Sequence, residues 1–300
     1  MKVVVLLSTY NGEKYLREQL NSLINQSYKD VDILVRDDGS SDSTKKILDE
    51  YKNAGKLDWY AGENLGASMS FWHLLHHCHD ADYYAFCDQD DVWDKEKLQI
   101  AINKLNKEDN SIPLLYCSDV RVVDSKLNLL SEHMVAPMPV DYPHALIRNL
   151  APGCTFVFNN AAKLILSQYD VKLGVELHDW LTYQIVLCFG KVYYDLESHL
   201  SYRQHQENVI GDIRKGRKQK LKKAKSFLWG EMKNSRQKNA LKLEQAFGNK
   251  MSNENLRITE KFAHYLENKE FKKALLKSDE IRFSGTEYLF FKLLVMLKRF

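Results

Sequence analysis

Strand-like and helix-like segments alternate through the first hundred residues of this 300-residue chain. Continuous apolar runs at Val3–Leu7 and Tyr83–Cys87 are typical of central strands covered on both faces. Two further strands are predicted between them, at 31–36 and 57–60, and helical patterns separate the four strands, at 13–25, 43–53 and 67–78. This alternation predicts an α/β fold with an open, mostly parallel central sheet flanked by helices.

The pattern is less regular after residue 113. Strand-like runs are predicted at 114–124, with a break near Asp119, and at 154–158, 192–196 and 200–203, and helices at 161–169 and 178–189. The stretch 125–143 holds three of the five prolines and is predicted to be a loop. We expect a catalytic domain over 1–212 and a helical C-terminal region over 213–300.

Three carboxylates follow the Tyr83–Cys87 strand within four residues: Asp88, Asp90 and Asp91. Charges of one sign packed so closely repel one another, and folding alone gains nothing from them. A hard divalent cation resolves the conflict, because Mg²⁺ or Mn²⁺ prefers carboxylate oxygens and keeps positions open for phosphate. A solvated acidic turn that caps the following helix is the alternative interpretation.

Polar residues also follow the first two predicted strands, as Ser8-Thr9-Tyr10-Asn11 and Asp37-Asp38. Ligands of open α/β sheets bind beyond the carboxyl ends of the strands, so these residues and the acidic stretch are expected to line one crevice. A carboxylate can accept a hydrogen bond from the imide of uracil or thymine. We therefore predict that Asp38 contacts a base and that Ser8 or Thr9 contacts base or ribose, although Asp38-Gly39-Ser40 also fits a tight turn.

His178-Asp179-Trp180 opens an apolar helix. An aspartate at a helix N-terminus is favourable as a cap, so Asp179 is either a cap or a general base. Further along the chain, His205 can complete a metal shell or contact a diphosphate.

These motifs together resemble the family 2 glycosyltransferases, which are inverting enzymes of the GT-A fold. The resemblance covers about residues 1–212 and rests on Ser8 to Asn11, Asp37 to Asp42, the Asp88-Gln89-Asp90 form of the Asp-x-Asp motif, and His178-Asp179-Trp180. The Tyr202-Arg203-Gln204-His205 tail with Asn208 to Gly211 is similar to bacterial rhamnosyltransferases of cell-wall and capsular polysaccharide synthesis. One departure is His178, where the family often has an acidic residue.

The resemblance implies transfer of a sugar, L-rhamnose from dTDP-L-rhamnose or otherwise a hexose from a UDP-sugar, to a saccharide hydroxyl. It implies a Mg²⁺ or Mn²⁺ ion on Asp88, Asp90 and His205, a nucleotide held by Ser8 to Asn11, Asp38 and Asp88, and Asp179 as the base. The remaining candidates would contact donor sugar or acceptor: Asp91, Trp93, Gly153, Cys154, Thr155, His178, Trp180 and Arg203. A non-catalytic nucleotide-sugar-binding partner is the alternative from another class.

Two other groups of residues have plainer explanations. Four histidines crowd the end of the 67–78 helix, but no cysteine or carboxylate pattern completes a zinc site, so we expect ordinary, partly exposed side chains: His73, His76, His77 and His79. Trp72, Trp93 and Trp180 could stack on sugars or pack in the core. The five isolated cysteines indicate a reducing cytoplasm and argue against a disulfide framework.

Charge is distributed unevenly along the chain. Residues 1–210 carry 20 basic and 30 acidic side chains, whereas residues 211–300 carry 23 and 10. Eight of the twelve residues at 214–225 are basic, and an aromatic stretch, Phe227 to Trp229, follows them. This pattern favours contact of a basic helix with anionic lipid. Nucleic acid is the competing partner, but no recognition fold accompanies the patch, and a solvated helix face is the plain alternative.

We expect a cytoplasmic protein, peripheral on the inner face of the plasma membrane, since neither a signal peptide nor an apolar run of about 18 residues is recognised. The apolar stretch Leu289–Leu297 is too short to span a bilayer. It could pack on the catalytic domain, lie on a membrane or join subunits into an oligomer.

Overall fold

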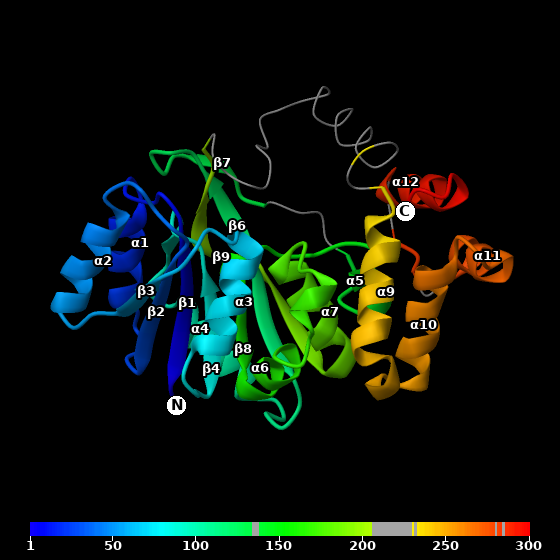
Figure 1. Ribbon diagram of the computed structural model, residues 1–300, viewed down its shortest axis with the longest axis horizontal. Helices are drawn as coiled ribbons and strands as arrows, with labels where there is room; N and C mark the ends of the chain where they lie inside the picture. Colours follow the sequence, from blue (N-terminus) through cyan, green and yellow to red (C-terminus); the bar gives the residue numbers. More distant parts are fainter. Residues whose placement is uncertain (134–137, 206–229, 231–232, 280, 284–285) are drawn as a thin grey trace. The chain divides into compact units, whose positions relative to one another are not determined.

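The computed structural model describes residues 1–133, 138–205, 230, 233–279, 281–283 and 286–300 (Figure 1). The predicted basic segment 214–225 and the Asn208 to Gly211 motif therefore lie outside the described residues. The chain divides into two compact units. One comprises Met1–Ala136 and Asn149–His205, and the other comprises Pro137–Arg148 and Gln206–Phe300.

The first unit is built on a nine-stranded mixed sheet (Figure 1). Its order is β3 (Asp58–Ala61), β2 (Val31–Asp37), β1 (Val3–Thr9), β4 (Tyr83–Cys87), β8 (Val157–Asn159), β6 (Leu114–Val123), β9 (Lys191–Arg203) and β5 (Val92–Trp93), with β7 (Leu129–Ser131) paired to β6. The first four strands are parallel. Strand β8 runs antiparallel between β4 and β6, and β9 returns parallel to β6. The predicted α/β architecture is confirmed.

Helices cover both faces of the sheet. Alternate side chains of β1, such as Val5 and Leu7, join one core with apolar residues of α1 (Leu16–Ile24), α2 (Thr44–Asn53) and α4 (Lys97–Leu105). On the opposite face lie α3 (Ala67–His77), α6 (Asn160–Leu166) and α7 (His178–Phe189), where Phe86 packs against Phe71 at a ring distance of 5.2 Å. Because β1 is covered on both faces, its Val3–Leu7 run is continuously apolar and fully buried.

Three predicted segments differ in detail from the structure. Residues 192–203 form one long strand, β9, and the expected break near Asp119 is a shift of register between β6 and β9. The run 154–158 starts as a 3-10 turn over Gly153–Thr155, because the amides of Thr155 and Phe156 bond to the carbonyls of Pro152 and Gly153 at 3.0 and 2.9 Å.

The predicted loop 125–143 contains two short elements, β7 and the start of α5 (Tyr142–Ala145). Proline does not prevent this helix, because Pro143 lies in its first turn, where a missing amide hydrogen costs nothing. The carboxylate of Asp141 caps the helix by accepting from the amide of His144 at 2.9 Å.

The second unit is helical, as expected for a C-terminal helical region. It contains α5, α9 (Ser235–Phe247), α10 (Asn253–His264), α11 (Lys269–Lys277) and α12 (Thr286–Met296). Its small core includes the buried side chains of Phe247, Phe262, Leu275, Phe291 and Phe300. Helix α5 is part of it, since the hydroxyls of Tyr142 and Thr259 bond at 2.7 Å.

Candidate active site

The ends of three parallel strands meet at one edge of the sheet. The register pairs Thr9 of β1 with Asp37 of β2, and Leu7 of β1 with Cys87 of β4. The polar residues after these strands therefore start at the same level, as the sequence predicts.

Side-chain hydrogen bonds join the loops after β1 and β4. The carboxamide oxygen of Gln89 accepts from the hydroxyl of Thr9 at 2.6 Å and from the amide of Tyr10 at 2.9 Å, and its NH₂ group donates to the carbonyl of Tyr10. On the other side, the amide of Asn11 donates to the hydroxyl of Ser40 at 2.9 Å. Tyr10 remains exposed above this braced loop.

Asp38 lies next to this loop and is buried. Its carboxylate forms an ion pair with Arg36 and accepts from the backbone amides of Leu65 and Gly66, both at 2.9 Å. The guanidinium also donates to the hydroxyl of Ser70, which in turn accepts from Ser8. Asp38 is therefore held rigidly against the loop that precedes α3.

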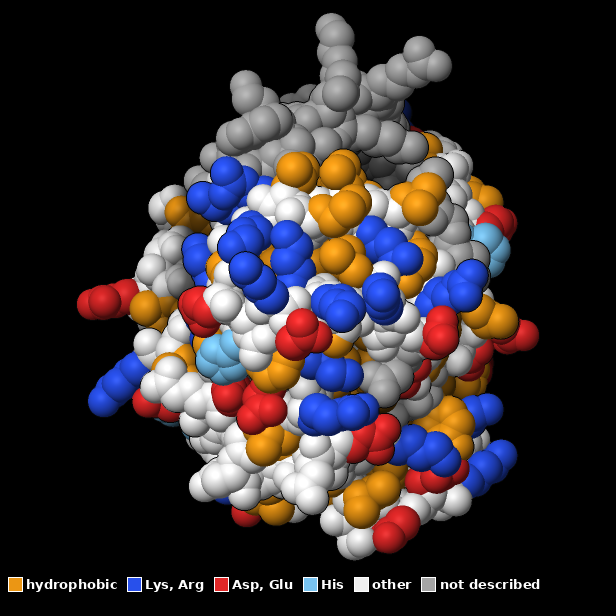
Figure 2. Space-filling model, turned by 90° about the vertical axis from the view of Figure 1, so that its right-hand side faces the viewer, with side chains coloured by type: hydrophobic (Ala, Val, Ile, Leu, Met, Phe, Trp, Pro, Cys, Tyr) orange, Lys and Arg blue, Asp and Glu red, His pale blue; other side chains and the backbone are white. Residues whose placement is uncertain are grey.

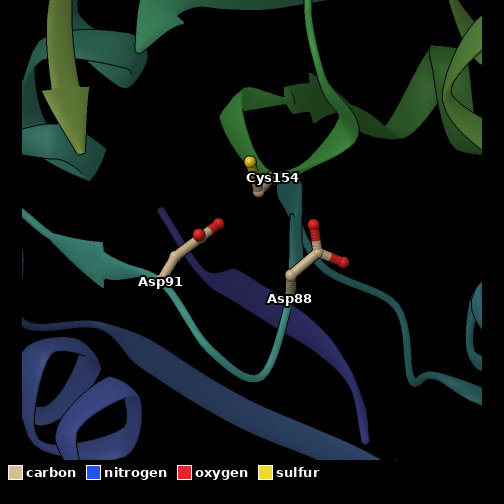
Figure 3. Close-up of side chains that lie close together, drawn as sticks. All are labelled: Asp88, Asp91 and Cys154. Atoms are coloured by element: carbon tan, nitrogen blue, oxygen red, sulfur yellow. The ribbon is translucent and has the colours of Figure 1, made fainter. Parts of the chain in front are cut away.

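The acidic stretch after β4 forms the centre of the site (Figure 3). Asp88, Asp91 and Cys154 each offer one ligand atom, and these atoms all lie within 4.8 Å of one another. Asp91 is fully buried and accepts from the amide of Arg203 at 3.1 Å, while its other oxygen has no nitrogen or oxygen partner among the described residues. Burial raises the pKa of the Cys154 thiol well above its usual value.

Asp90 has a different partner. Its carboxylate lies 2.6 Å from the Nε2 atom of His205, and the His205 ring lies 5.1 Å from that of Tyr15. The predicted metal ligands therefore form two groups. Asp88 lies beside Asp91 and Cys154, and Asp90 is paired with His205.

The pKa of the Asp88 carboxyl is affected by Asp179, which is distant in the sequence. Burial, followed by the nearby charges of Asp90 and Asp179, raises the pKa of Asp88 to about 7. Neighbouring negative charges raise the pKa of a carboxyl group. A divalent cation bound between such carboxylates would neutralise these charges and displace the protons, so the arrangement suits a cation site. The buried oxygen of Asp91 that has no nitrogen or oxygen partner among the described residues fits the same conclusion, whereas the neutral thiol of Cys154, which hydrogen-bonds to Asp91, is a poor ligand for Mg²⁺ or Mn²⁺.

Asp179 lies on the first turn of α7 and is 5% exposed. Its carboxylate accepts from the amide of Trp180 at 2.7 Å and also bonds to the backbone of Gly153. Burial nevertheless raises the pKa of Asp179 to about 6. A carboxylate with this pKa takes up a proton more readily than a surface aspartate, as a general base must.

His178 and Gly153 shape the surroundings of Asp179. The imidazole of His178 stacks on Phe71 at a ring distance of 4.1 Å and meets the edge of Phe86 at 5.3 Å, and burial lowers its pKa to about 3. A Cβ atom placed on Gly153 would lie 2.8 Å from Nε2 of His178 and 3.1 Å from Cβ of Asp179. The approach of the 3-10 turn to α7 therefore requires glycine.

Glycosyl transferase family 2 is the protein family whose sequence profile matches this chain, over residues 4–160. The match covers more than half of the chain and includes the strand ends and the acidic stretch. This chain is a family 2 glycosyltransferase. Asp179, Arg203 and His205 lie beyond the matched region, so their assignment depends on the geometry given above.

Two relatives of this glycosyltransferase have names that state different donors. The dTDP-rhamnosyl transferase RfbG of Shigella flexneri is 29% identical over 226 residues, which are 68% of this chain and 73% of that protein. The UDP-Glc:alpha-D-GlcNAc-diphosphoundecaprenol beta-1,3-glucosyltransferase WfgD of Escherichia coli is 30% identical over 158 residues, 52% of this chain and 58% of that protein.

Solved structures confirm the fold. Residues 1–349 of Staphylococcus aureus TarS, in complex with UDP-GlcNAc, superpose with a TM-score of 0.61 at 16% identity, covering 93% of this chain and 77% of those TarS residues. The mannosyltransferase PcManGT of Pyrobaculum calidifontis, with GDP-Man and Mn²⁺, gives 0.56 at 14% identity, covering 99% and 84%. The glycosyltransferase thus has the GT-A fold with a C-terminal helical region.

Several predicted site residues are buried or form their contacts within the protein. Trp93 is 3% exposed and packs in the core of the sheet, and Trp180 and Thr155 are also buried, so none of the three presents a free face to a sugar. Arg203 is 2% exposed. Its guanidinium donates to Glu18 at 2.5 Å and to the carbonyls of Asp90 and Ser125 at 2.7 and 2.8 Å, which makes it a brace for the acidic stretch.

Lys97 is a residue of the site that sequence reasoning missed. It is 1% exposed, lies 3.6 Å from the centre of the Trp93 ring, and has no hydrogen-bond partner among the described residues for its ammonium group. Burial lowers its pKa to about 8, and the charge of the Asp91 carboxylate opposes that shift. A lysine at the start of a helix resembles an ordinary surface residue, so the sequence carries no signal of this buried cation.

Proposed function

We propose that this protein is an inverting, metal-dependent glycosyltransferase that moves L-rhamnose from dTDP-L-rhamnose to a saccharide hydroxyl in bacterial surface polysaccharide synthesis. The donor follows from the resemblance of the sequence motifs and from the dTDP-rhamnosyl transferase activity in the name of the Shigella relative. The nucleotide-sugar class is further supported by the UDP-GlcNAc and GDP-Man named with the two solved structures.

One observation carries the proposal. The turn Gly153–Thr155 joins the candidate metal ligands to the candidate base, because Gly153 lies against Asp179 and the thiol of Cys154 lies within 4.8 Å of ligand atoms of Asp88 and Asp91. A candidate metal ligand and a candidate base therefore lie at one place. Inverting transfer requires this convergence, because the base must reach the acceptor while the cation neutralises the departing diphosphate on the opposite side of the reacting carbon.

We propose Asp88 and Asp90 as the metal ligands, with His205 completing the shell and Asp91 as an additional carboxylate beside Asp88. When bound, Mg²⁺ or Mn²⁺ would neutralise the charge that develops on the leaving diphosphate. The Mn²⁺ named with the Pyrobaculum structure supports a divalent ion in this fold.

The chain's own groups have separate roles in the reaction. Asp179 removes the proton from the acceptor hydroxyl, whose oxygen then bonds to the anomeric carbon as the bond to the nucleotide diphosphate breaks. Ser8, Tyr10 and Asn11 contact the nucleotide at the strand ends, and the buried side chains of Thr9 and Asp38 hold the surrounding loops in place. Gly153 and His178 position Asp179 beside the donor sugar, Cys154 lies beside Asp88 and Asp91, and Arg203 fixes the backbone of Asp90.

A hexose transferred from a UDP-sugar is the second candidate, favoured by the glucosyltransferase activity in the name of the Escherichia coli relative. The experiment that separates the candidates incubates the protein with dTDP-rhamnose, UDP-glucose and UDP-GlcNAc in Mg²⁺ or Mn²⁺ and measures released nucleotide. We expect release with dTDP-rhamnose and its loss on chelation. Release with a UDP-sugar alone would reassign the donor, and binding without release from any donor would indicate a non-catalytic partner.

Asp179→Asn tests whether the Asp179 carboxylate acts as the general base. This change removes the proton acceptor but keeps size and hydrogen-bonding capacity, so kcat should fall by about 10²–10⁴-fold with donor affinity nearly unchanged. Asp170→Asn is the matched control, since Asp170 also accepts from a backbone amide at a helical turn but is exposed. Equal turnover of the two variants would refute the role of Asp179.

We further propose that the protein is cytoplasmic and binds the inner face of the plasma membrane, with residues 1–212 as the catalytic domain and 213–300 as the basic region that makes contact. The diphosphoundecaprenol acceptor in the name of the Escherichia coli relative supports a lipid-linked acceptor. No described helix is long and apolar enough to cross a bilayer.

A further inference from the structure

Helix α12 has an exposed apolar face. Eight of the nine residues from Leu289 to Leu297 are apolar. One side of the helix packs inward through Phe291, Leu294 and Val295, which are at most 2% exposed. The other side exposes three large residues spaced as on a single helix face, Leu289 at 67%, Leu293 at 42% and Met296 at 53%, and Leu297, at 50%, extends this row into the turn after the helix.

Cations border this face. The ammonium of Lys272 on α11 donates to the carbonyl of Met296 at 2.9 Å, which places its charge beside the end of the apolar row. Lys298 follows the row directly and donates to the carbonyl of Leu266, and Lys292 lies 4.6 Å from the centre of the Tyr288 ring on α12 itself. The view in Figure 2 shows hydrophobic side chains interspersed with Lys and Arg on the C-terminal helices.

We propose that the exposed row of α12, formed by Leu289, Leu293, Met296 and Leu297, inserts into the interface of an anionic lipid bilayer. Lys272, Lys292 and Lys298 would lie at the level of the headgroups, where cations are attracted to anionic lipid. This exposed row would be a defined surface for the membrane association proposed above, and it is distinct from the basic segment 214–225. The inference rests on that proposed association but not on the identity of the donor.

The same charges favour a bilayer over a second copy of the chain. A two-fold dimer through α12 would bring the bordering lysines of one copy close to those of the other. Juxtaposed charges of one sign oppose association, whereas an anionic surface is complementary to them. A helix of 11 residues with one packed face and one exposed face also suits a position in the plane of the membrane.

The test is co-sedimentation of the full-length protein with vesicles of phosphatidylcholine, with and without phosphatidylglycerol. The double variant Leu289→Gln/Leu293→Gln should reduce partitioning onto the anionic vesicles at least tenfold. Lys292→Ala should reduce it about fivefold, and only when phosphatidylglycerol is present. The basic segment stays intact in every variant, so these losses report on α12 itself.

Leu196→Gln is the matched control, because Leu196 of β9 is 68% exposed but lies in the other unit. It should partition like the wild type. Thermal unfolding and solution turnover of donor should be unchanged in all variants, which separates this test from that of the glycosyltransferase function. Unchanged partitioning of the double variant would overturn the proposal, as would a wild-type dimer that this variant dissociates.

Discussion

Burial changes the acidity of several single residues in the catalytic unit. It raises the pKa of Asp179 to about 6 and that of Asp88 to about 7, and it lowers the pKa of His178 to about 3. In each case burial disfavours the charged form of the side chain, and the pKa shifts accordingly. The site therefore contains carboxylates that bind protons readily next to an imidazole that stays neutral, and such perturbed groups mark functional sites.

Gly153→Ala tests how closely the 3-10 turn must approach Asp179. The new methyl group would meet Nε2 of His178, which cannot move away because its ring is stacked on Phe71. Displacement of α7 by a fraction of an ångström should lower kcat about 10- to 100-fold while donor binding persists. Gly248→Ala is the control, because a methyl group there meets only ordinary contacts at 3.6 Å. Equal kcat for both variants would contradict the requirement.

His178 should make stability depend on pH. Its pKa is about 3 in the folded chain and about 6.5 when unfolded, so the unfolded chain binds the extra proton between these values. The stabilisation is complete above pH 6.5 and is lost as pH falls toward 3, with a slope approaching about 1.4 kcal/mol per pH unit.

Urea unfolding at several pH values between 7.5 and 4.5, compared between the wild type and His178→Gln, measures this contribution, because the raised pKa values of Asp88 and Asp179 add a slope of the opposite sign to both proteins. The contribution of His178 should be absent from His178→Gln, whereas His79→Gln should have the pH dependence of the wild type, since His79 is 49% exposed. A slope that is identical in the wild type and His178→Gln would show that the imidazole is not held neutral by burial.

At the scale of elements, Arg203 ties three segments together. It lies at the end of β9, its guanidinium reaches Glu18 on α1, and it also donates to carbonyls in the acidic loop after β4 and in the turn after β6. The ring of Tyr15 lies 4.5 Å from the guanidinium carbon. The position of Asp90 therefore depends on elements that are far apart in the sequence.

Arg203→Lys should break this brace although it preserves the charge, because an ammonium group cannot match a planar fork of donors. We expect a loss of about 2–3 kcal/mol in the free energy of unfolding. We also expect weaker binding of Mn²⁺, measured by calorimetric titration. Arg17→Lys is the control, since its ion pair with Glu50 is about half exposed and should contribute at most about 1 kcal/mol. Comparable losses in both variants would argue against the brace.

At the scale of the whole molecule, the second unit is discontinuous in sequence. It takes Pro137–Arg148 from the middle of the chain and combines it with the C-terminal helices. Tyr142 and Ala145 are buried there, and the backbone of Ile147 accepts from Arg236. The segment 137–148 therefore depends on residues beyond 212.

Truncation after residue 212 should expose Tyr142, Ala145 and Leu146, which are at most 3% exposed in the full chain. We expect the truncated protein to bind a hydrophobic dye and to self-associate on size exclusion, unlike the full chain. Replacing Tyr142 and Leu146 by Gln in the truncated protein should restore a monomer. A monomeric truncated protein without dye binding would show that the segment does not need the C-terminal helices.

Much of this architecture is encoded locally. The apolar runs at Val3–Leu7 and Tyr83–Cys87 are buried strands because only a doubly covered strand excludes polar residues on both faces. The α7 helix begins at His178 and ends at Phe189, as its apolar pattern predicts. Strand direction after β4 could not be predicted, because a short run such as Val157–Asn159 pairs antiparallel only through contacts with β4 and β6.

The sequence alone determined the alternation of strands and helices, the family, and the order of the polar motifs at the strand ends, because these depend on periodicity and on residue type. Tertiary structure decided which side chains share one environment. It paired Asp90 with His205, grouped Asp88 with Asp91 and Cys154, buried Lys97 and Trp93, and left one face of α12 exposed. Burial and charge proximity arise only when distant segments pack, so no local pattern records them.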